Sequence, residues 1–334
     1  MLSNYITRIL GSALDKYPKL QEHLVNYKSD SLKIVYYHMV SDTNHKYYFA
    51  NKSITPENFY EQLLFLKKNF EIISFNEAFY LIDNKKKLDK KLVLTFDDGF
   101  KENYTVIAPI LSELNITGAF FFISNCIDNK DLMWRNKLLL LEENITNKSL
   151  YETSIRFKIP KIKKNQDLLS WSLNTWPMSK KEEIVNTLCD EYLPYKVEDF
   201  LEENSPYCTS EEIKRLYENN FEIGSHSKTH PIFNKLDYES LCHEIISSKE
   251  KIENIINDKI QLFSYPFGIR AARDFEKLFL SKNEQIKTLL GIKNNLNNLN
   301  SNYNFWERDN LEFPIRVMKF RLLVLPIIRK IWQY

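Results

Sequence analysis

The chain has 334 residues, of which 43% are hydrophobic and 27% charged, and its formal net charge is +2. This is the composition of an ordinary globular protein, and a charge so near zero argues against a nucleic-acid partner. The four cysteines form no C-x-x-C pair, which argues against a structural zinc site or a disulfide framework and predicts reduced thiols. The first 28 residues contain no uninterrupted apolar run, so we expect no secretory signal and a cytoplasmic location.

Helix and strand patterns alternate in the first third of the chain. Residues 5–27 have apolar side chains at helical spacing, and residues 32–40 form a run of β-branched and aromatic residues typical of a strand. Thr55 precedes a proline and predicts a helix start. The apolar runs 91–96 and 118–123 are too short for helices and predict buried strands. The alternation indicates parallel β/α units in a barrel or doubly wound sheet.

The alternation stops between residues 128 and 205, which we expect to form a helical insertion or cap. It resumes with a capped helix at 209–219, a strand at 221–224, a long helix at 237–256 and a strand at 262–265. The predicted organisation is an N-terminal helical segment (1–30), an α/β core (31–127 and 206–320), the helical insertion (128–205) and a basic apolar tail (321–334).

The C-terminal segment from residue 313 onward carries five basic and no acidic side chains among many apolar ones. One interpretation is a peripheral contact with the inner face of a membrane, because basic amphipathic segments bind anionic lipid surfaces. The other is a last strand and a packing helix with solvated charges. We favour the second.

Two short motifs follow predicted core strands. The adjacent carboxylates Asp97 and Asp98 suit a division of labour, in which one binds a metal and the other accepts a proton. His226 and His230 are four residues apart, a spacing that places both rings on one side of a helical turn. Either motif alone is common as a turn or a surface helix. Together they predict a two-histidine, one-carboxylate site for Zn²⁺, Co²⁺, Fe²⁺ or Ni²⁺, with zinc first.

With a third motif, residues 263–268 (Phe-Ser-Tyr-Pro-Phe-Gly), the chain resembles the polysaccharide deacetylase superfamily, the NodB-like carbohydrate esterases of family 4. The resemblance covers roughly residues 32–125 and 206–318. It implies a distorted (β/α)-barrel of the NodB-homology type, with the helical insertion outside it.

The resemblance also implies roles for individual residues. Asp97 becomes the general base that activates water, and Asp98, His226 and His230 become the metal ligands. The backbone N–H of Phe267 stabilises the oxyanion, and Tyr265, Pro266 and Phe267 shape the substrate pocket.

The chain departs from the family pattern at two places. The third motif lacks the usual arginine beside the base, and Arg270, Arg308 or Arg316 are the candidates to replace it. The usual C-terminal Leu-x-His is also absent. His38, after the first predicted strand, resembles the general acid of a branch with a permuted barrel. The alternative is that His38 is a core histidine with ordinary hydrogen bonds.

The function implied by the resemblance is metal-dependent removal of an acetyl group from an N-acetylated sugar or glycan in surface-polysaccharide biosynthesis. The substrate is then nucleotide-linked, lipid-linked or a polymer. The alternatives are hydrolysis of another acyl group (formyl or O-acetyl) and an inactive carbohydrate-binding member. The insertion is expected to be a substrate lid, an oligomer contact or scaffold; the sequence does not choose among these, and it does not predict the oligomeric state.

Overall fold

The computed structural model describes residues 12, 14, 16–26, 31–48, 53–163, 166–292, 297–298, 304–325 and 327. Its centre is a mostly parallel sheet in the order β10-β1-β3-β4-β5-β6-β7-β9, with β2 beside β3 and the antiparallel β8 beside β1. The strands are β1 (Ser31–Tyr37), β2 (Glu71–Ile72), β3 (Lys91–Phe96), β4 (Ala119–Phe122), β5 (Glu222–Ser225), β6 (Leu262–Ser264), β7 (Thr288–Gly291), β8 (Asn297–Asn298), β9 (Phe305–Glu307) and β10 (Asp309–Asn310).

Strands β3 and β4 are buried along almost their whole length. Both faces of a parallel sheet are covered, so its strands are continuous apolar runs rather than alternating ones. The register pairs Thr95 with Ala119 and Phe96 with Phe120, and the two phenylalanine rings stack at 4.9 Å between centroids. The carboxyl ends of the parallel strands therefore meet at one edge of the sheet, where Asp97 and Asp98 follow β3.

The segment 305–310 joins the two edges of the sheet. Its first part, β9, pairs with β7, and its second part, β10, pairs with β1. The sheet consequently curls into a nearly closed barrel surrounded by helices, and the predicted distorted (β/α)-barrel is confirmed. Arg308 lies between the two short strands, at the point where the ring closes.

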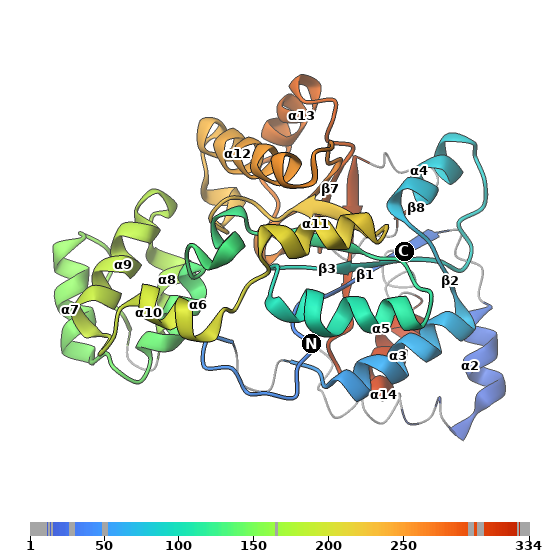
Figure 1. The fold of residues 1–334 in the computed structure, drawn as a ribbon, viewed down its shortest axis with the longest axis horizontal. Helices are drawn as coiled ribbons and strands as arrows, with labels where there is room; N and C mark the ends of the chain where they lie inside the picture. Colours follow the sequence, from blue (N-terminus) through green and yellow to red (C-terminus); the bar gives the residue numbers. More distant parts are fainter. Residues whose placement is uncertain are drawn as a thin grey trace.

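Helices cover the outside of the barrel (Figure 1). In that view α3 and α5 lie below the sheet, and α11, α12 and α13 lie above it. The predicted helix start at Thr55 is confirmed, because its hydroxyl accepts a hydrogen bond from the Asn58 N–H. The covering helices are α2 (Pro18–Val25), α3 (Pro56–Asn69), α4 (Phe75–Asp83), α5 (Ala108–Glu113), α11 (Ser210–Glu218), α12 (Tyr238–Ile256), α13 (Arg273–Lys282) and α14 (Ile315–Lys319).

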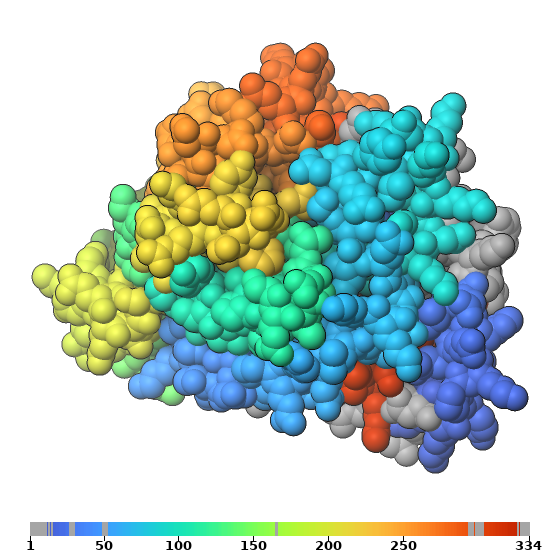
Figure 2. Space-filling model, turned by 45° about the vertical axis from the view of Figure 1, so that its right-hand side comes forward, coloured from blue at the N-terminus to red at the C-terminus, as the bar shows by residue number. Residues whose placement is uncertain are grey.

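The segment between β4 and β5 forms a helical lobe at one side of the barrel (Figures 1 and 2). It has its own apolar core, in which Trp134, Trp171 and Trp176 are all but inaccessible to solvent. We call it the insertion lobe. Its helices are α6 (Trp134–Leu141), α7 (Asn147–Arg156), α8 (Leu168–Thr175), α9 (Lys181–Tyr192) and α10 (Val197–Asn204).

The two ends of the chain test the sequence interpretation only in part. Most of the N-terminal segment 1–30, and most of the tail 321–334, lies outside the described residues. The described part of the tail is helical, and Leu322 and Leu323 are buried in the barrel core, as a packing helix requires. No strand follows residue 313 in the part of the chain that the structure describes, so the strand expected there is wrong. None of the described helices is both long and apolar enough to cross a membrane.

Candidate active site

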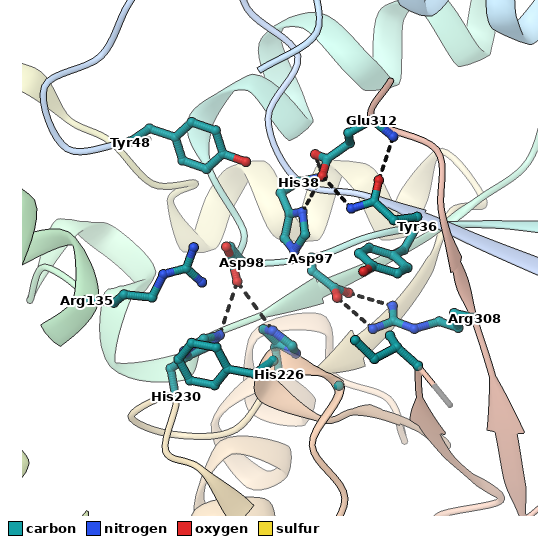
Figure 3. Close-up of a pocket in the computed structure, with 14 residues that line it drawn as sticks. Tyr36, His38, Tyr48, Asp97, Asp98, Arg135, His226, His230, Arg308 and Glu312 are labelled. Atoms are coloured by element: carbon teal, nitrogen blue, oxygen red, sulfur yellow. Dashed lines mark hydrogen bonds and ion pairs between the residues drawn. The ribbon is translucent and has the colours of Figure 1, made fainter. Parts of the chain in front are cut away.

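A cavity of about 180 Å³ lies at the carboxyl ends of the strands. It is lined by residues that follow β1, β3, β5 and β6, by the segment that closes the barrel and by one residue of the insertion lobe (Figure 3). The lining residues are Tyr36, His38, Tyr48, Asp97, Asp98, Arg135, His226, His230, Phe267, Gly268, Ile292, Arg308, Asn310 and Glu312.

Asp98, His226 and His230 meet at the base of this cavity. Oδ1 of Asp98 lies 3.3 Å from Nε2 of His226 and 3.5 Å from Nε2 of His230. All three side chains are buried, and their ligand atoms lie within 4.8 Å of one another. Apart from these two contacts, Oδ1 of Asp98 accepts no hydrogen bond from any described residue, although a buried carboxylate oxygen normally accepts one. The arrangement fits a divalent cation placed between the three side chains.

The hydrogen bonding of His226 and the pKa of His230 also suit a metal. Nδ1 of His226 donates a hydrogen bond of 2.8 Å to the carbonyl oxygen of Ser264, which fixes the ring with Nε2 directed at Asp98. Burial lowers the pKa of His230 to about 4, against the opposing effect of Asp98. A neutral imidazole is the form that binds a metal.

The loop that carries both histidines is not a helical turn, so that part of the sequence interpretation is wrong. Residues 226–230 are irregular, and Ser227 and His230 have φ values of 70° and 56°. These left-handed conformations turn the chain back after β5 and bring the His230 ring beside His226, at 5.0 Å between centroids. The predicted proximity is confirmed, but it arises from a different backbone.

Contacts outside the barrel strands hold this loop in place. The Trp134 indole of α6 donates a hydrogen bond of 2.8 Å to the His230 carbonyl oxygen. The Glu244 carboxylate of α12 accepts hydrogen bonds from the N–H groups of Lys228 and Thr229, at 2.9 and 2.8 Å. The insertion lobe thus contributes directly to the geometry of the loop that carries His226 and His230.

Asp97 lies beside the triad and binds Arg308. The guanidinium donates two parallel hydrogen bonds to the carboxylate, Nη1 to Oδ1 at 2.8 Å and Nη2 to Oδ2 at 2.7 Å. Burial alone would raise the pKa of Asp97, but the charge and hydrogen bonds of Arg308 outweigh it and hold the pKa below its usual value. Of the three candidate arginines, Arg308 is the one in contact with Asp97. Arg270 instead pairs with Glu276 and Glu307.

His38 lies on the opposite side of Asp97 and is paired with Glu312. Its Nδ1 is 2.8 Å from Oε2 of Glu312, whose Oε1 accepts a hydrogen bond of 2.6 Å from the His38 backbone N–H. Burial lowers the pKa of His38, but Glu312, with smaller effects of Asp98 and Asp97, reverses this and raises it to about 9. In Figure 3 the ring lies between Glu312 and the two aspartates. His38 therefore faces the cavity as an imidazolium at neutral pH.

The third motif is only partly in the cavity. Phe267 lines it, with its ring 4.7 Å from that of His230, and has a left-handed φ of 57°. Pro266 precedes it in the same turn. Tyr265 is directed the other way and packs between Phe233 and Phe263, in the apolar cluster that joins β6 and β7 to α12 and α13. The expectation that Tyr265 shapes the pocket is not met, because the backbone turns between residues 265 and 267.

Several lining residues were not predicted from the sequence. Glu312, Tyr48 and Arg135 belong to no recognisable motif, and each comes from a segment far from the three motifs in sequence. Arg135 extends from α6 toward Asp98, with its guanidinium carbon 5.3 Å from the centre of the Phe267 ring (Figure 3). Glu312 follows β9 and β10, which are too short for the sequence pattern to have predicted them.

Comparisons with known proteins agree with this geometry. The family model for polysaccharide deacetylases matches residues 84–279. YxkH of Bacillus subtilis (strain 168), whose name classes it with the polysaccharide deacetylases, is 29% identical over 105 residues, or 31% of this chain and 36% of YxkH. The chain thus matches about a third of the length of that relative.

Two solved structures share the fold. The deacetylase PplD of Streptococcus pyogenes, in complex with acetate, is 14% identical and has a TM-score of 0.54 over 84% of this chain and 92% of PplD. IcaB of Ammonifex degensii is 15% identical and has a TM-score of 0.56 over 87% of this chain and 98% of IcaB. Identities this low show the fold alone. The family match, however, spans more than half of the chain and includes Asp97, Asp98, His226 and His230, and on that ground the chain belongs to the polysaccharide deacetylase family.

Proposed function

We propose that this protein is a metal-dependent N-deacetylase that hydrolyses the acetamido group of a glycan. The observation that carries the proposal is the spatial arrangement of the charged groups in one cavity. A carboxylate held ionised by Arg308 lies on one side of the Asp98–His226–His230 triad, and an imidazolium held by Glu312 lies near it. A base and an acid at opposite ends of a reacting amide are what its hydrolysis needs.

Asp97 is the proposed general base. It takes a proton from the water that attacks the acetyl carbonyl carbon. Because Arg308 lowers its pKa, Asp97 is ionised throughout the neutral range, but it is also a weak base. A divalent cation held by Asp98, His226 and His230 would compensate for this weak basicity, because it would lower the pKa of water and polarise the acetyl oxygen.

His38 is the proposed general acid. When the carbon–nitrogen bond breaks, the sugar nitrogen needs a proton to leave as an amine rather than as an amide anion. His38 is protonated at neutral pH and faces the cavity, so it can donate that proton. Glu312 fixes the ring through Nδ1, and Nε2 remains for the substrate. The products are acetate and the free amine.

Phe267 and Pro266 are proposed to form the wall that receives the acetyl group. The backbone N–H of Phe267, at the tip of the turn after β6, is the proposed donor to the oxyanion. Tyr265 has no part in this wall, since it lies in the core.

The identity of the cation and the class of substrate are also part of the proposal. We propose zinc as the cation, because two imidazoles and one carboxylate are ligands that it favours. The family description, polysaccharide deacetylase, supports an acetylated carbohydrate as the substrate.

The test compares the two adjacent aspartates. Asp97→Asn is expected to lower kcat by about 10²- to 10⁴-fold while the protein still binds one metal, because it removes a base but no ligand. Asp98→Asn is expected to lose the metal. Metal content and acetate release from N-acetylated oligosaccharides are the two measurements.

The outcomes separate the alternatives. Near-wild-type acetate release by Asp97→Asn would contradict the assignment of the base. Bound metal with no acetate release from any N-acetylated substrate would direct attention to a formyl or O-acetyl group. Absence of metal in protein purified without chelator would leave a carbohydrate-binding member of the family as the better description.

A further inference from the structure

A second, larger cavity adjoins the catalytic one. Its volume is about 380 Å³, which is in the range of roughly 300–1,000 Å³ that small-ligand sites occupy. It lies between the segment after β1, the carboxyl end of α6 and the turn between α9 and α10. Asn44, Tyr48, Leu139, Glu142, Asn144 and Tyr195 are among the residues that line it.

The two cavities share a wall. Tyr48 lines both of them. Helix α6 also borders both, since Arg135 lines the catalytic cavity, and Leu139 and Glu142 line the second. Residues four and seven positions apart lie on one face of a helix, and seven residues advance about 10 Å along the axis. A ligand longer than one sugar ring could therefore follow this face from one cavity to the other.

The chemistry of the second cavity is that of a sugar site. Tyr48 and Tyr195 offer aromatic surface and phenolic hydroxyls, and Asn44 and Asn144 offer amides. The Tyr195 ring is 38% exposed and is supported from behind by Phe200, with the rings stacked at 6.0 Å. Rigid aromatic surface beside amides and carboxylates suits a ligand that presents C–H faces and many hydroxyl groups.

The charges in the second cavity disfavour a phosphate. Glu142 and Glu143 both line it, and Lys46 compensates only one of them. His45 also lines the cavity, and its Nε2 lies 3.2 Å from Oε1 of Glu102, which is not among the lining residues. An anionic carrier such as a nucleotide diphosphate would meet like charges there, whereas a neutral sugar would find hydrogen-bond acceptors for its hydroxyl groups.

We infer that the second cavity, formed in large part by the insertion lobe, binds a neutral sugar unit of the same glycan whose acetamido group occupies the catalytic cavity. This inference rests on the proposed function, because it takes the catalytic cavity to hold an acetylated sugar. It also gives the insertion lobe a role, since α6 and the α9–α10 turn form most of the second site.

The experiment measures binding apart from turnover. Asp97→Asn protein, loaded with metal, is titrated calorimetrically with N-acetylglucosamine, its β-1,4- and β-1,6-linked tetramers, and UDP-N-acetylglucosamine. We expect a tetramer to bind at least about tenfold more tightly than the monomer, and Tyr195→Ala to remove most of this gain while monomer affinity is unchanged. UDP-N-acetylglucosamine is expected to bind no more tightly than the monomer.

Two further variants control the result. Tyr80→Ala removes a tyrosine on α4 that is more exposed than Tyr195 (59% against 38%) and lines neither cavity, and it should change nothing. Asn144→Trp places an indole in the second cavity and should remove the tetramer's advantage without affecting the monomer. The inference is overturned if monomer and tetramers bind equally, if Tyr195→Ala weakens both alike, or if Asn144→Trp has no effect.

Acetate release by the wild-type protein distinguishes a failure of this inference from a failure of the proposed function. Length-dependent binding with no acetate release from any of these sugars would overturn the function and support the site. Acetate release with equal kcat/KM for monomer and tetramers would support the function and overturn the site.

Discussion

At the scale of single residues, the candidate site depends on unusual backbone conformations. Asp98, Ser227, His230 and Phe267 all have positive φ values, between 56° and 70°. Each such conformation costs a non-glycine residue on the order of 1–3 kcal/mol, and such residues gather at functional sites. Gly99 follows Asp98 at φ +69°, where a Cβ atom would lie 2.6 Å from the Phe122 ring. Only glycine lets the chain leave β3 in the direction that turns Asp98 inward.

The His38–Glu312 pair makes a prediction about pH. Glu312 raises the pKa of His38 to about 9, so the acid is present below that pH and activity should fall as the pH rises through it. Glu312→Gln removes the charge that raises the pKa. The basic limb of the kcat profile should then move to lower pH, with the acidic limb unchanged. The measurement is kcat from pH 5 to 10.

A matched carboxylate provides the control for this experiment. Glu102 also pairs with a histidine, His45, but not in the catalytic cavity. Glu102→Gln should leave the pH profile as it was. If both variants shift the profile equally, or neither does, His38 is not the acid that sets the basic limb.

At the scale of elements, the insertion lobe helps to position the loop that carries His226 and His230. The hydrogen bond from Trp134 to the His230 carbonyl oxygen crosses from α6 to the loop after β5. Trp134→Phe keeps an aromatic ring but removes this donor. Outer partners of metal ligands commonly affect affinity by about 10- to 100-fold, so we expect metal binding to weaken at least about tenfold. A competition titration with a chelating dye measures it.

Trp171 offers a control within the same lobe. Its indole is also fully buried and donates a hydrogen bond of 2.7 Å, but to the Pro160 carbonyl oxygen. Trp171→Phe should lower the stability of the lobe and leave metal affinity unchanged. Equal losses of metal affinity in the two variants would mean that the lobe acts only through its general stability.

The short strands β9 and β10 position Arg308, the side chain that binds Asp97. They pair with opposite edges of the sheet, and Arg308 between them is placed directly over the end of β3. Arg308 also donates hydrogen bonds to Thr95 at 3.0 Å and Ser264 at 2.6 Å, which ties the closing segment to β3 and β6. Closing the barrel and holding the proposed base are thus performed by one segment.

At the scale of the whole molecule, a bound metal would connect the loops after β3 and β5. A ligand that binds only the folded state stabilises it by about 2.7 kcal/mol at 100 times its dissociation constant. Urea unfolding of the wild-type protein with zinc and with chelator should show a difference of this size. His226→Ala should abolish it, since it removes one of three ligands. An equal effect of zinc on this variant would place the stabilising metal elsewhere.

Much of the barrel could be predicted from the sequence because it depends on local patterns. The apolar runs at β3 and β4, the capped starts of α3 and α11, and the helical character of the insertion are each set by neighbouring residues. The proximity of Asp98, His226 and His230 was predictable for a related reason. Each of its motifs directly follows a strand, and the ends of parallel strands converge.

The sequence by itself therefore determined the fold class, and it predicted that Asp98, His226 and His230 lie together beside Asp97. Tertiary structure alone decided that Arg308 holds Asp97, that Glu312 holds His38, that Tyr265 turns into the core and that Arg135 reaches the cavity. The reason is that Arg308 and Glu312 are more than 200 residues from their partners. Their contacts depend on how the barrel closes and where the insertion lobe packs, and no local pattern of side chains records either.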